Sequence, residues 1–407
     1  MLAFTFPGQG SQRPGMGRPW VEHPSWEVVE EASAVSGRDL AHLLLHADQE
    51  ELTLTANAQL ATFVLSLVVL DAIERVGLAP TVCAGHSLGE YSALAAAGAL
   101  PFADGVRLVV ERGEAMHQAA EERHGTMAAV LGADDDVVEI ACQRAEADVW
   151  VANYNAPGQV VIAGDPDAVR RAGELARQAG ARKVLPFPVA GAFHTALMAP
   201  ARARLRKALA NTAFGPCEVP VVANVDAAAH EQAADWPGLL SAQLCSPVRW
   251  RQSLGTVVDL GATVVVEVGP GGVLTGLARR ATPQLKALAV ATPDQLDTLV
   301  DQVAGLDAAH HAPLHQGEHL YASERVVVSP AAGVFQPDGS CPAPGPGGVP
   351  AADAGVQVAV GDQLGTVGEA AVRTPFAGTV VGFLAHPGER VVSGQPLAWL
   401  RVSESPA

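Results

Sequence analysis

The chain has 407 residues, of which 49% are hydrophobic and 17% charged, and its formal net charge is −17. Length and composition predict a folded protein of about two to three domains and exclude a disordered one. The negative charge argues against nucleic-acid binding, which needs clustered cations. The N-terminus lacks the basic and long apolar segments of a signal peptide, and the most apolar run, residues 60–70, is shorter than a membrane span. We therefore expect a cytoplasmic protein with no nucleic-acid or membrane partner.

Residues 1–124 alternate short apolar strands with helices, and the alternation resumes over residues 196–300. This pattern is typical of an α/β layer fold, and we interpret the two stretches as one α/β-hydrolase-like large subdomain. Residues 125–195, between them, are expected to fold in the order strand, helix, strand, strand, helix, strand. The expected strands are 126–131, 148–154, 159–164 and 182–188, and the expected helices are 135–145 and 166–179. This order predicts an inserted ferredoxin-like (βαββαβ) subdomain, with a cleft between it and the large subdomain.

The character of the chain changes after residue 296. Residues 301–324 are polar, contain two adjacent histidines and are expected to form a linker. Residues 325–407 contain short valine-rich strands separated by glycines, with a Pro/Gly loop at 342–350. We expect a small all-β domain in this last part of the chain.

The clearest chemical signal is the Gly-x-Ser-x-Gly sequence at residues 85–89, in which Ser87 is the serine. A short apolar strand ends just before it, and an alanine-rich helix, residues 91–100, follows it. A serine in this context sits on a sharp strand-to-helix turn that exposes its hydroxyl. We predict that Ser87 is a nucleophile; the alternative is a glycine-flanked helix N-cap.

A serine nucleophile needs a base, donors for the oxyanion and a group that selects the acyl chain. His194 follows the last strand of the inserted subdomain and is the candidate base, although a histidine with apolar neighbours is often structural. The glycine-rich turn at residues 6–12 follows the first strand and offers backbone N–H groups, unless it is an ordinary turn. Arg112 lies on a helix with an apolar face and is a candidate clamp for a carboxylate; the alternative is a surface ion pair.

Further motifs accompany these residues in a fixed order between residue 2 and about residue 290. They are Phe6-Pro7-Gly8-Gln9-Gly10-Ser11-Gln12, Asn57-Ala58-Gln59, Gly85 to Glu90, Arg112, Asn155 to Gly164, Phe193-His194, Ser246 to Trp250 and Glu267 to Gly271. With these motifs the chain resembles the malonyl-CoA:acyl-carrier-protein transacylase family. The type is shared by fatty acid biosynthesis, a part of lipid metabolism, and by the acyltransferase domains of polyketide synthases.

The resemblance implies a role for each matching residue. Ser87 would carry the malonyl group, and His194 would take the serine proton. The backbone N–H groups of Gln9 and Leu88 would form the oxyanion hole. Arg112 would pair with the free carboxylate of malonate, which favours a dicarboxylic acyl group over acetyl.

The resemblance also covers supporting positions. In this family a main-chain carbonyl, not a carboxylate, orients the histidine, and the matching position is Ser246. Gln59 and Asn155 match supporting positions of the pocket. Leu60 departs from the family, which usually has proline there, whereas the aromatic Phe193 before the histidine resembles the malonyl-selective members.

The resemblance implies substrates and partners as well. Malonyl-CoA would acylate the serine, and the thiol of a phosphopantetheinylated acyl carrier protein would then take the malonyl group in a ping-pong reaction. This chemistry needs no metal or redox cofactor, and the five cysteines have no Cys-x-x-Cys spacing that would suggest a zinc site. Because carrier proteins are acidic, docking needs a basic face, unless the basic residues are simply solvated. The two candidate clusters are Arg170, Arg171, Arg177, Arg182 and Lys183, and Arg202, Arg204, Arg206 and Lys207.

Residues 361–367, 374–380 and 388–397 resemble a biotinyl/lipoyl-like domain, a barrel-sandwich fold, with glycines at its turns. In that family a lysine on a hairpin carries the cofactor. Here the hairpin is expected at 369–373, and the last lysine of the chain is Lys286, so neither biotin nor lipoate can be attached. We expect this domain to serve docking, oligomerisation or positioning.

Two other interpretations stay open. The Gly-x-Ser-x-Gly sequence also occurs in α/β-type serine hydrolases and thioesterases. Such an enzyme would require an acid between the serine and the histidine and no group specific for a carboxylate, so Arg112 argues against it. The second alternative is a catalytically idle scaffold that binds a carrier protein or a carboxylase component through the C-terminal domain.

Overall fold

The computed structural model describes residues 1–187, 189, 191–303, 324–338, 356–368 and 370–401. The chain divides into two compact units, the first made of Met1–Leu70 and Pro80–His310 and the second of Asp71–Ala79 and His311–Ala407. The structure is mixed α/β, as predicted.

The first unit is built around a six-stranded sheet with the strand order β10-β9-β1-β2-β7-β8. The strands are β1 (Leu2–Phe6), β2 (Val82–Gly85), β7 (Val221–Val222), β8 (Ala229–His230), β9 (Val264–Val268) and β10 (Lys286–Val290). All neighbouring strands are parallel except the pair β7 and β8. Every residue of β1, β2 and β9 is buried, which is why these strands are mainly apolar, with Thr5 and Glu267 as exceptions, rather than alternating.

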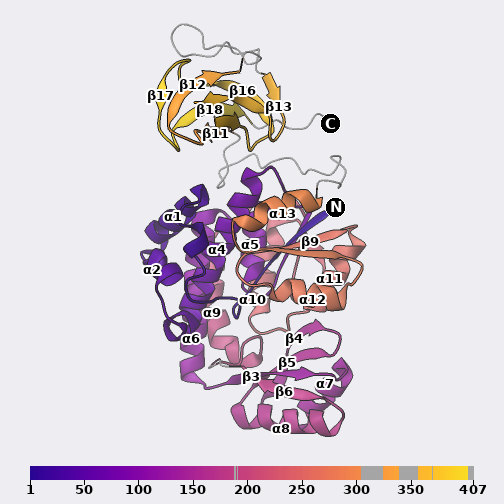
Figure 1. Cartoon of the computed structure of the whole chain (residues 1–407). Helices are drawn as coiled ribbons and strands as arrows, with labels where there is room; N and C mark the ends of the chain where they lie inside the picture. The colour runs from indigo at the N-terminus through magenta and orange to yellow at the C-terminus, as the bar shows by residue number, and fades with distance from the viewer. Residues whose placement is uncertain (188, 190, 304–323, 339–355, 369, 402–407) are drawn as a thin grey trace. The chain divides into compact units, whose positions relative to one another are not determined.

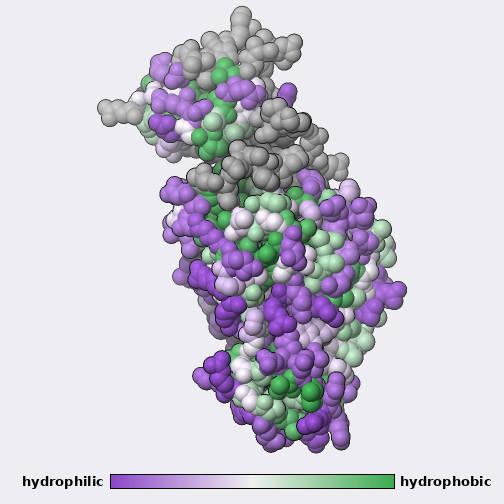
Figure 2. Space-filling model, turned by 90° about the vertical axis from the view of Figure 1, so that its right-hand side faces the viewer, coloured by the Kyte–Doolittle hydropathy of each residue, from purple (hydrophilic) through white to green (hydrophobic). Residues whose placement is uncertain are grey.

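Helices surround this sheet (Figure 1). They are α1 (Glu27–Ser36), α2 (Leu40–Leu45), α3 (Gln49–Thr53), α4 (Thr55–Arg75), α5 (Gly89–Ala96), α6 (Phe102–Glu122), α9 (Ala199–Ala210), α10 (Trp236–Gln243), α11 (Trp250–Asp259), α12 (Val273–Ala281) and α13 (Asp294–Val303). Short 3-10 helices are η1 (Arg18–Trp20), η2 (Pro24–Trp26), η3 (Ala196–Met198) and η4 (Ala233–Asp235). In the view of Figure 2 the surface of this unit is mainly hydrophilic with small hydrophobic patches, as expected for a face exposed to water.

Helix α4 is longer than the apolar run that the sequence indicated. By length and composition alone its 21 residues would allow a membrane span, the one such case among the described helices. However, 89% of its most apolar window is buried inside the protein, and residues 60–70 are buried throughout. It therefore serves as a core helix.

A second, smaller sheet with the order β4-β5-β3-β6 lies in the same unit. Its elements follow one another as β3 (Thr126–Leu131), α7 (Asp135–Arg144), β4 (Val149–Ala156), β5 (Gln159–Gly164), α8 (Pro166–Gln178) and β6 (Lys183–Pro186). The strand pairs are antiparallel, and α7 and α8 pack side by side against one face of the sheet (Figure 1). Strand β6 ends earlier than expected, and Pro188 lies outside the described residues.

Backbone hydrogen bonds join this small sheet to the rest of the first unit. The N–H of Tyr154 on β4 donates to the carbonyl of Val248 (2.9 Å), and the N–H of Val248 donates to the carbonyl of Ala152 (2.9 Å). Strand β4 is bulged here, which turns Asn155 toward the end of the large sheet. The edge of the small sheet is thus attached directly beside the candidate site.

Residues 324–338, 356–368 and 370–401 form two four-stranded sheets with the orders β11-β18-β16-β13 and β15-β14-β12-β17. The strands are β11 (Glu324–Val328), β12 (Gly333–Pro337), β13 (Val356–Val358), β14 (Gln363–Val367), β15 (Ala370–Arg373), β16 (Gly378–Phe383), β17 (Arg390–Val391) and β18 (Pro396–Arg401). Neighbouring strands in both sheets are antiparallel, and the core between the sheets includes Phe335, Leu364 and Leu397. The Pro/Gly loop predicted at 342–350 lies outside the described residues.

The linker predicted at 301–324 differs from the structure at its two ends. Residues 301–303 complete helix α13, because Leu296, Leu299 and Val303 repeat at helical spacing and are buried. Glu324 begins strand β11. Residues 304–323 lie outside the described part of the chain.

Candidate active site

The serine turn (residues 85–90) connects β2 to α5. Ser87 has φ +54°, in the left-handed region that few non-glycine residues adopt. A Cβ on Gly85 would overlap the backbone of Gly89, and a Cβ on Gly89 would overlap the carbonyl of Phe6 on the neighbouring strand β1. Only glycine therefore permits this close approach at both positions, and the resulting sharp turn holds the Ser87 hydroxyl beyond the end of the sheet.

The structure brings Ser87 and His194 together. The Ser87 Oγ lies 2.7 Å from Nε2 of His194, and Nδ1 of His194 lies 2.8 Å from the carbonyl oxygen of Gln243. A carbonyl only accepts hydrogen bonds, so Nδ1 carries the hydrogen and Nε2 is free to accept the serine proton. His194 itself has φ +62°, a strained backbone of the kind that clusters at functional sites. This arrangement is that of a nucleophile with its base.

The carbonyl that orients the histidine is a different one from the expected Ser246. The hydrogen bond goes to Gln243, the last residue of α10. Carbonyls at a helix end lack an intrahelical partner, and the residue four positions on is Pro247, which has no N–H to donate. The carbonyl of Ser246 contributes a weaker stabilisation of the protonated ring. The helix end followed by proline is the sequence signal that would have indicated Gln243.

His194 is neutral at physiological pH. Burial is the main cause that lowers its pKa, to about 3, and the positive charge of Arg112 lowers it further. The carbonyls of Gln243 and Ser246 act in the opposite direction but more weakly. A neutral imidazole is the form that can accept the Ser87 proton.

Arg112 reaches the same hydroxyl from helix α6. It is 1% exposed, and its Nη2 donates to Ser87 Oγ (3.1 Å) and to Oε1 of Gln243 (3.0 Å), while Nη1 donates to Oε1 of Gln59 (2.5 Å). This burial excludes the surface ion pair considered from the sequence. No carboxylate of the described residues lies within ion-pair distance of the guanidinium. A buried cation held by neutral groups is suited to bind an anion.

The glycine-rich turn after β1 lies beside the serine turn. A Cβ on Gly8 would lie 2.5 Å from the carbonyl oxygen of His86, which explains why glycine stands there. Within the described part of the chain, the backbone N–H groups of Gln9 and Leu88 donate no hydrogen bond. Both groups are thus available to a ligand near Ser87.

The other two sequence-predicted residues, Gln59 and Asn155, are connected to the site through different partners. Gln59, on α4, contacts Arg112 directly. Asn155, on β4, reaches the site through His86: its Oδ1 lies 2.9 Å from Nε2 of His86 in the serine turn. Asn155 therefore supports the turn from the small sheet.

Sequence reasoning assigned no role to Asn224. Its Oδ1 accepts the backbone N–H of Ser87 (2.7 Å), and its Nδ2 donates to the carbonyl of Gly85 (2.6 Å). It follows the short strand β7, which pairs with β2, so the sheet itself places it next to the serine turn. No motif of the sequence marked this residue, because its function depends on strand order rather than on local pattern.

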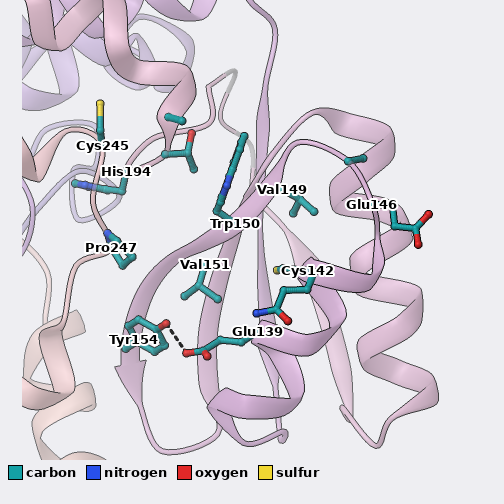
Figure 3. A pocket seen from close by; sticks show the side chains of 14 residues that line it. Glu139, Cys142, Glu146, Val149, Trp150, Val151, Tyr154, His194, Cys245 and Pro247 are labelled. Carbon is teal, nitrogen blue, oxygen red and sulfur yellow. Dashed lines mark hydrogen bonds between the residues drawn. The ribbon is translucent and has the colours of Figure 1, made fainter.

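A pocket of about 570 Å³ reaches His194 from the side of the small sheet (Figure 3). One wall comes from α7 and β4, including Trp150 and Glu139, and the other from the segments around His194 and Pro247. Tyr154 donates a hydrogen bond to Glu139 across its floor (2.7 Å). The described residues contain no group of three or more His, Cys, Asp or Glu side chains placed to hold a metal ion.

Comparisons with known proteins agree with this geometry. The acyl transferase domain model matches residues 3–314. The malonyl CoA-acyl carrier protein transacylase of Bacillus subtilis is 41% identical over 304 residues, covering 74% of this chain and 96% of the relative. The crystal structure of an acyl carrier protein S-malonyltransferase from Vibrio cholerae has a TM-score of 0.71 at 41% identity, covering 73% of this chain and 99% of that one.

A further solved structure is described as a type II PKS acyl-carrier protein in complex with its malonyl-transacylase. It has a TM-score of 0.72 at 39% identity and covers 74% of this chain and 99% of that one. The resemblance inferred from the ordered motifs is thereby confirmed at the level of the family. The chain belongs to the acyl transferase domain family, with malonyl CoA-acyl carrier protein transacylases among its relatives.

Proposed function

We propose that this protein transfers a malonyl group from malonyl-CoA to the phosphopantetheine thiol of an acyl carrier protein, through a malonyl ester on Ser87. One observation carries the proposal: the Ser87 hydroxyl contacts both a neutral histidine and a buried arginine. The first is a base for the nucleophile and the second a site for a carboxylate on the acyl group. Relatives named as malonyl CoA-acyl carrier protein transacylases support the same reaction.

The reaction uses groups of the chain itself. His194 accepts the proton of Ser87 as the serine oxygen attacks the thioester carbonyl. The N–H groups of Gln9 and Leu88 stabilise the oxyanion. The C–S bond then breaks, and the CoA sulfur leaves with the proton from His194. The carrier thiol then attacks the malonyl ester, and the same steps run in reverse. Because residues of the chain supply every group that these steps need, we propose that no metal or redox cofactor takes part.

Arg112 selects the acyl group in this proposal. The malonate carboxylate forms charge-assisted hydrogen bonds with the guanidinium, which Gln59 and Gln243 hold in place as neutral acceptors. An acetyl group has no such charge and leaves the buried cation without an anion. Gln59 holds the guanidinium from the other side, and Asn155 holds the serine turn through His86.

The experiment that tests this function compares two products. The protein is incubated with malonyl-CoA, with and without a phosphopantetheinylated carrier, and malonyl-carrier is measured against free malonate. We expect malonyl-carrier to dominate. Predominant release of malonate would instead support a hydrolase or thioesterase, and activity in cells that survives Ser87→Ala would support a scaffold.

We also propose the domain organisation that the sequence predicted. Residues 1–124 and 196–300 form the large subdomain, and residues 125–195 the ferredoxin-like insertion. The element order β3-α7-β4-β5-α8-β6 supports the insertion. A cytoplasmic location remains part of this proposal.

The C-terminal part is proposed to be a biotinyl/lipoyl-like domain reused for docking, oligomerisation or positioning. Two antiparallel four-stranded sheets support this fold, and the lack of lysine after Lys286 rules out a biotinyl or lipoyl amide. A chain that ends at residue 303 tests the role of the C-terminal domain. If this shortened chain transfers malonyl to a free carrier at an unchanged rate, the domain does not act in the chemical step.

Carrier docking is proposed on a basic surface of the first unit. In both candidate clusters some cations already have partners: Arg170 pairs with Asp167 and Glu174, and Arg204 pairs with Glu111 and Glu114. This leaves the exposed Arg206 and Lys207 on α9, and Arg182 and Lys183 at the start of β6, as the freer charges. Charge reversal of each pair tests which one raises the KM for the carrier without changing self-malonylation.

A further inference from the structure

Glu90 is a fully buried carboxylate that no step above uses. Its Oε1 accepts the backbone N–H of Asn224 (2.7 Å), and its Oε2 accepts a hydrogen bond from Nε2 of Gln243. Both partners contact Ser87: Asn224 accepts its N–H (2.7 Å), and Gln243 donates to its carbonyl (2.8 Å). One carboxylate thus holds the two residues that hold the backbone of the nucleophile.

The amide of Gln243 is fully used, and it can be satisfied in one orientation only. Its oxygen accepts from Arg112 (3.0 Å), and its NH2 group donates to Glu90 and to the Ser87 carbonyl. The two ends of an amide have nearly the same shape but opposite hydrogen-bonding character, whereas an ionised carboxylate only accepts. If the amide were reversed, its oxygen would face two acceptors and its NH2 group would face the guanidinium.

Gln243 also acts through its backbone, since its carbonyl oxygen accepts the hydrogen bond from Nδ1 of His194. A single residue therefore contacts the base, the serine and the arginine. Resting on the malonyl transfer proposed above, we propose that Glu90 is a positioning residue that sets the orientation of Gln243 so that Arg112 and His194 both meet the Ser87 hydroxyl.

The charge of Glu90 is what this role requires. Both atoms that face its oxygens are N–H donors, so a proton on the carboxyl group would have no acceptor there. Glutamine at this position has the same shape, but whichever way its amide turned, its NH2 group would face one donor. Burial is the main cause that raises the pKa of Glu90, to about 7, so forming the buried charge carries an energetic cost.

Glu90→Gln is the direct test, with Glu267→Gln as the matched control. Glu267 is another buried carboxylate, and its hydrogen-bond partners, among them Thr275, lie outside this network. We expect E90Q to form malonyl-Ser87 more slowly, by about the 10- to 100-fold that the loss of a hydrogen-bond partner of a metal ligand costs. We also expect it to discriminate less between malonyl- and acetyl-CoA. E267Q should keep both properties. E90Q with the wild-type rate and preference would overturn the inference.

A double-mutant cycle separates positioning from a general loss of structure. If Glu90 acts through Gln243, then E90Q placed in a Gln243→Leu background changes the rate by less than about twofold. If the rate loss in the double variant equals the product of the losses in the two single variants, the inference is overturned. Glu90→Asp, which keeps the charge but shortens the side chain, serves as the second variant if E90Q does not fold, and an unchanged malonyl preference in E90D would also count against the inference.

Labelling of Ser87 by a fluorophosphonate reagent distinguishes a failure of the proposed function from a failure of this inference. The reagent needs the serine and its base but no acyl donor. A wild-type protein that is labelled but never malonylated would overturn the proposed malonyl transfer. The role of Glu90 would then still be tested by comparing the labelling rates of the wild type and E90Q. Equal labelling of wild type and E90Q would overturn the inference.

Discussion

The serine turn and the pair formed by His194 and Gln243 meet at one hydroxyl, but they are held there by different means. The turn is shaped by its own sequence, because glycines at 85 and 89 allow a backbone approach that any side chain would block. His194 and Gln243 lie on separate segments and are joined by hydrogen bonds that exist only in the folded chain. One half of the site is therefore local and rigid, and the other half depends on long-range contacts.

The largest loss of activity should come from substitutions of Ser87 and His194, the residues at which the two halves of the site meet. Ser87→Ala removes the nucleophile and should abolish the malonyl adduct in an intact-mass measurement, a loss of about 10³-fold or more. His194→Ala leaves the turn and the oxyanion donors in place, so we expect a slow residual acylation. Equal residual rates in the two variants would contradict a covalent serine intermediate. Unfolding midpoints close to that of the wild type provide the control.

Gly89→Ala breaks the local half. The added methyl group would overlap the carbonyl of Phe6 on β1, so either the turn or the sheet must shift. We expect a loss of about 3 kcal/mol in the free energy of unfolding, measured with urea. Gly276→Ala on α12 is the matched control. It meets open space, and alanine there should stabilise the chain by roughly 0.5–1 kcal/mol. Equal effects of both changes would show that the close approach at Gly89 is not required.

Arg112→Ala removes a long-range partner of Ser87 and Gln243 but leaves the glycines that shape the turn. Losing the partner of a buried carboxylate costs on the order of 3 kcal/mol, so kcat/KM for malonyl-CoA should fall about 100-fold while that for acetyl-CoA falls less. Arg107→Ala, an exposed arginine on the same helix paired with Asp104, should stay within about twofold of the wild type. An equal loss for both acyl groups would remove carboxylate recognition from the role of Arg112.

The two halves also differ in how far sequence reasoning could reach them. Ser87 could be predicted because its glycines and the strand and helix around it are neighbours in the chain. The carbonyl that orients His194 was assigned to Ser246, whereas the carbonyl of Gln243 accepts the hydrogen bond from the ring. Pro247 marks the Gln243 carbonyl in the sequence as one without a helical partner, but its distance from the ring depends on the fold. Asn224 was missed for the same reason, since it is brought to the serine by the pairing of β2 with β7.

The same distinction holds for the fold. The alternation of strands and helices indicated an α/β architecture, because each element carries its own periodicity. The end of helix α13 at Val303 was placed in a linker, since its buried face is defined by the residues it packs against rather than by composition. The local sequence pattern therefore predicts that a helix or strand exists, whereas the residue at which it ends depends on tertiary contacts.

The smallest effect concerns the pH dependence of the long-range half. Burial lowers the pKa of His194 to about 3, while in the unfolded chain the pKa is near 6.5. Between these values the unfolded chain binds the proton and the native protein does not, so stability falls as the pH drops from about 6.5 toward 3. His194→Gln removes this contribution and leaves Glu90, whose raised pKa acts in the opposite direction, in both proteins.

Between pH 7 and pH 5 the wild type should therefore lose about 2 kcal/mol more of its free energy of unfolding than His194→Gln, as measured by urea titration. Parallel curves for the two proteins would mean that His194 is solvated in the native state. In that case the long-range contacts would not keep the imidazole neutral. The distinction between a turn shaped by its own glycines and a histidine held by distant residues would then be wrong.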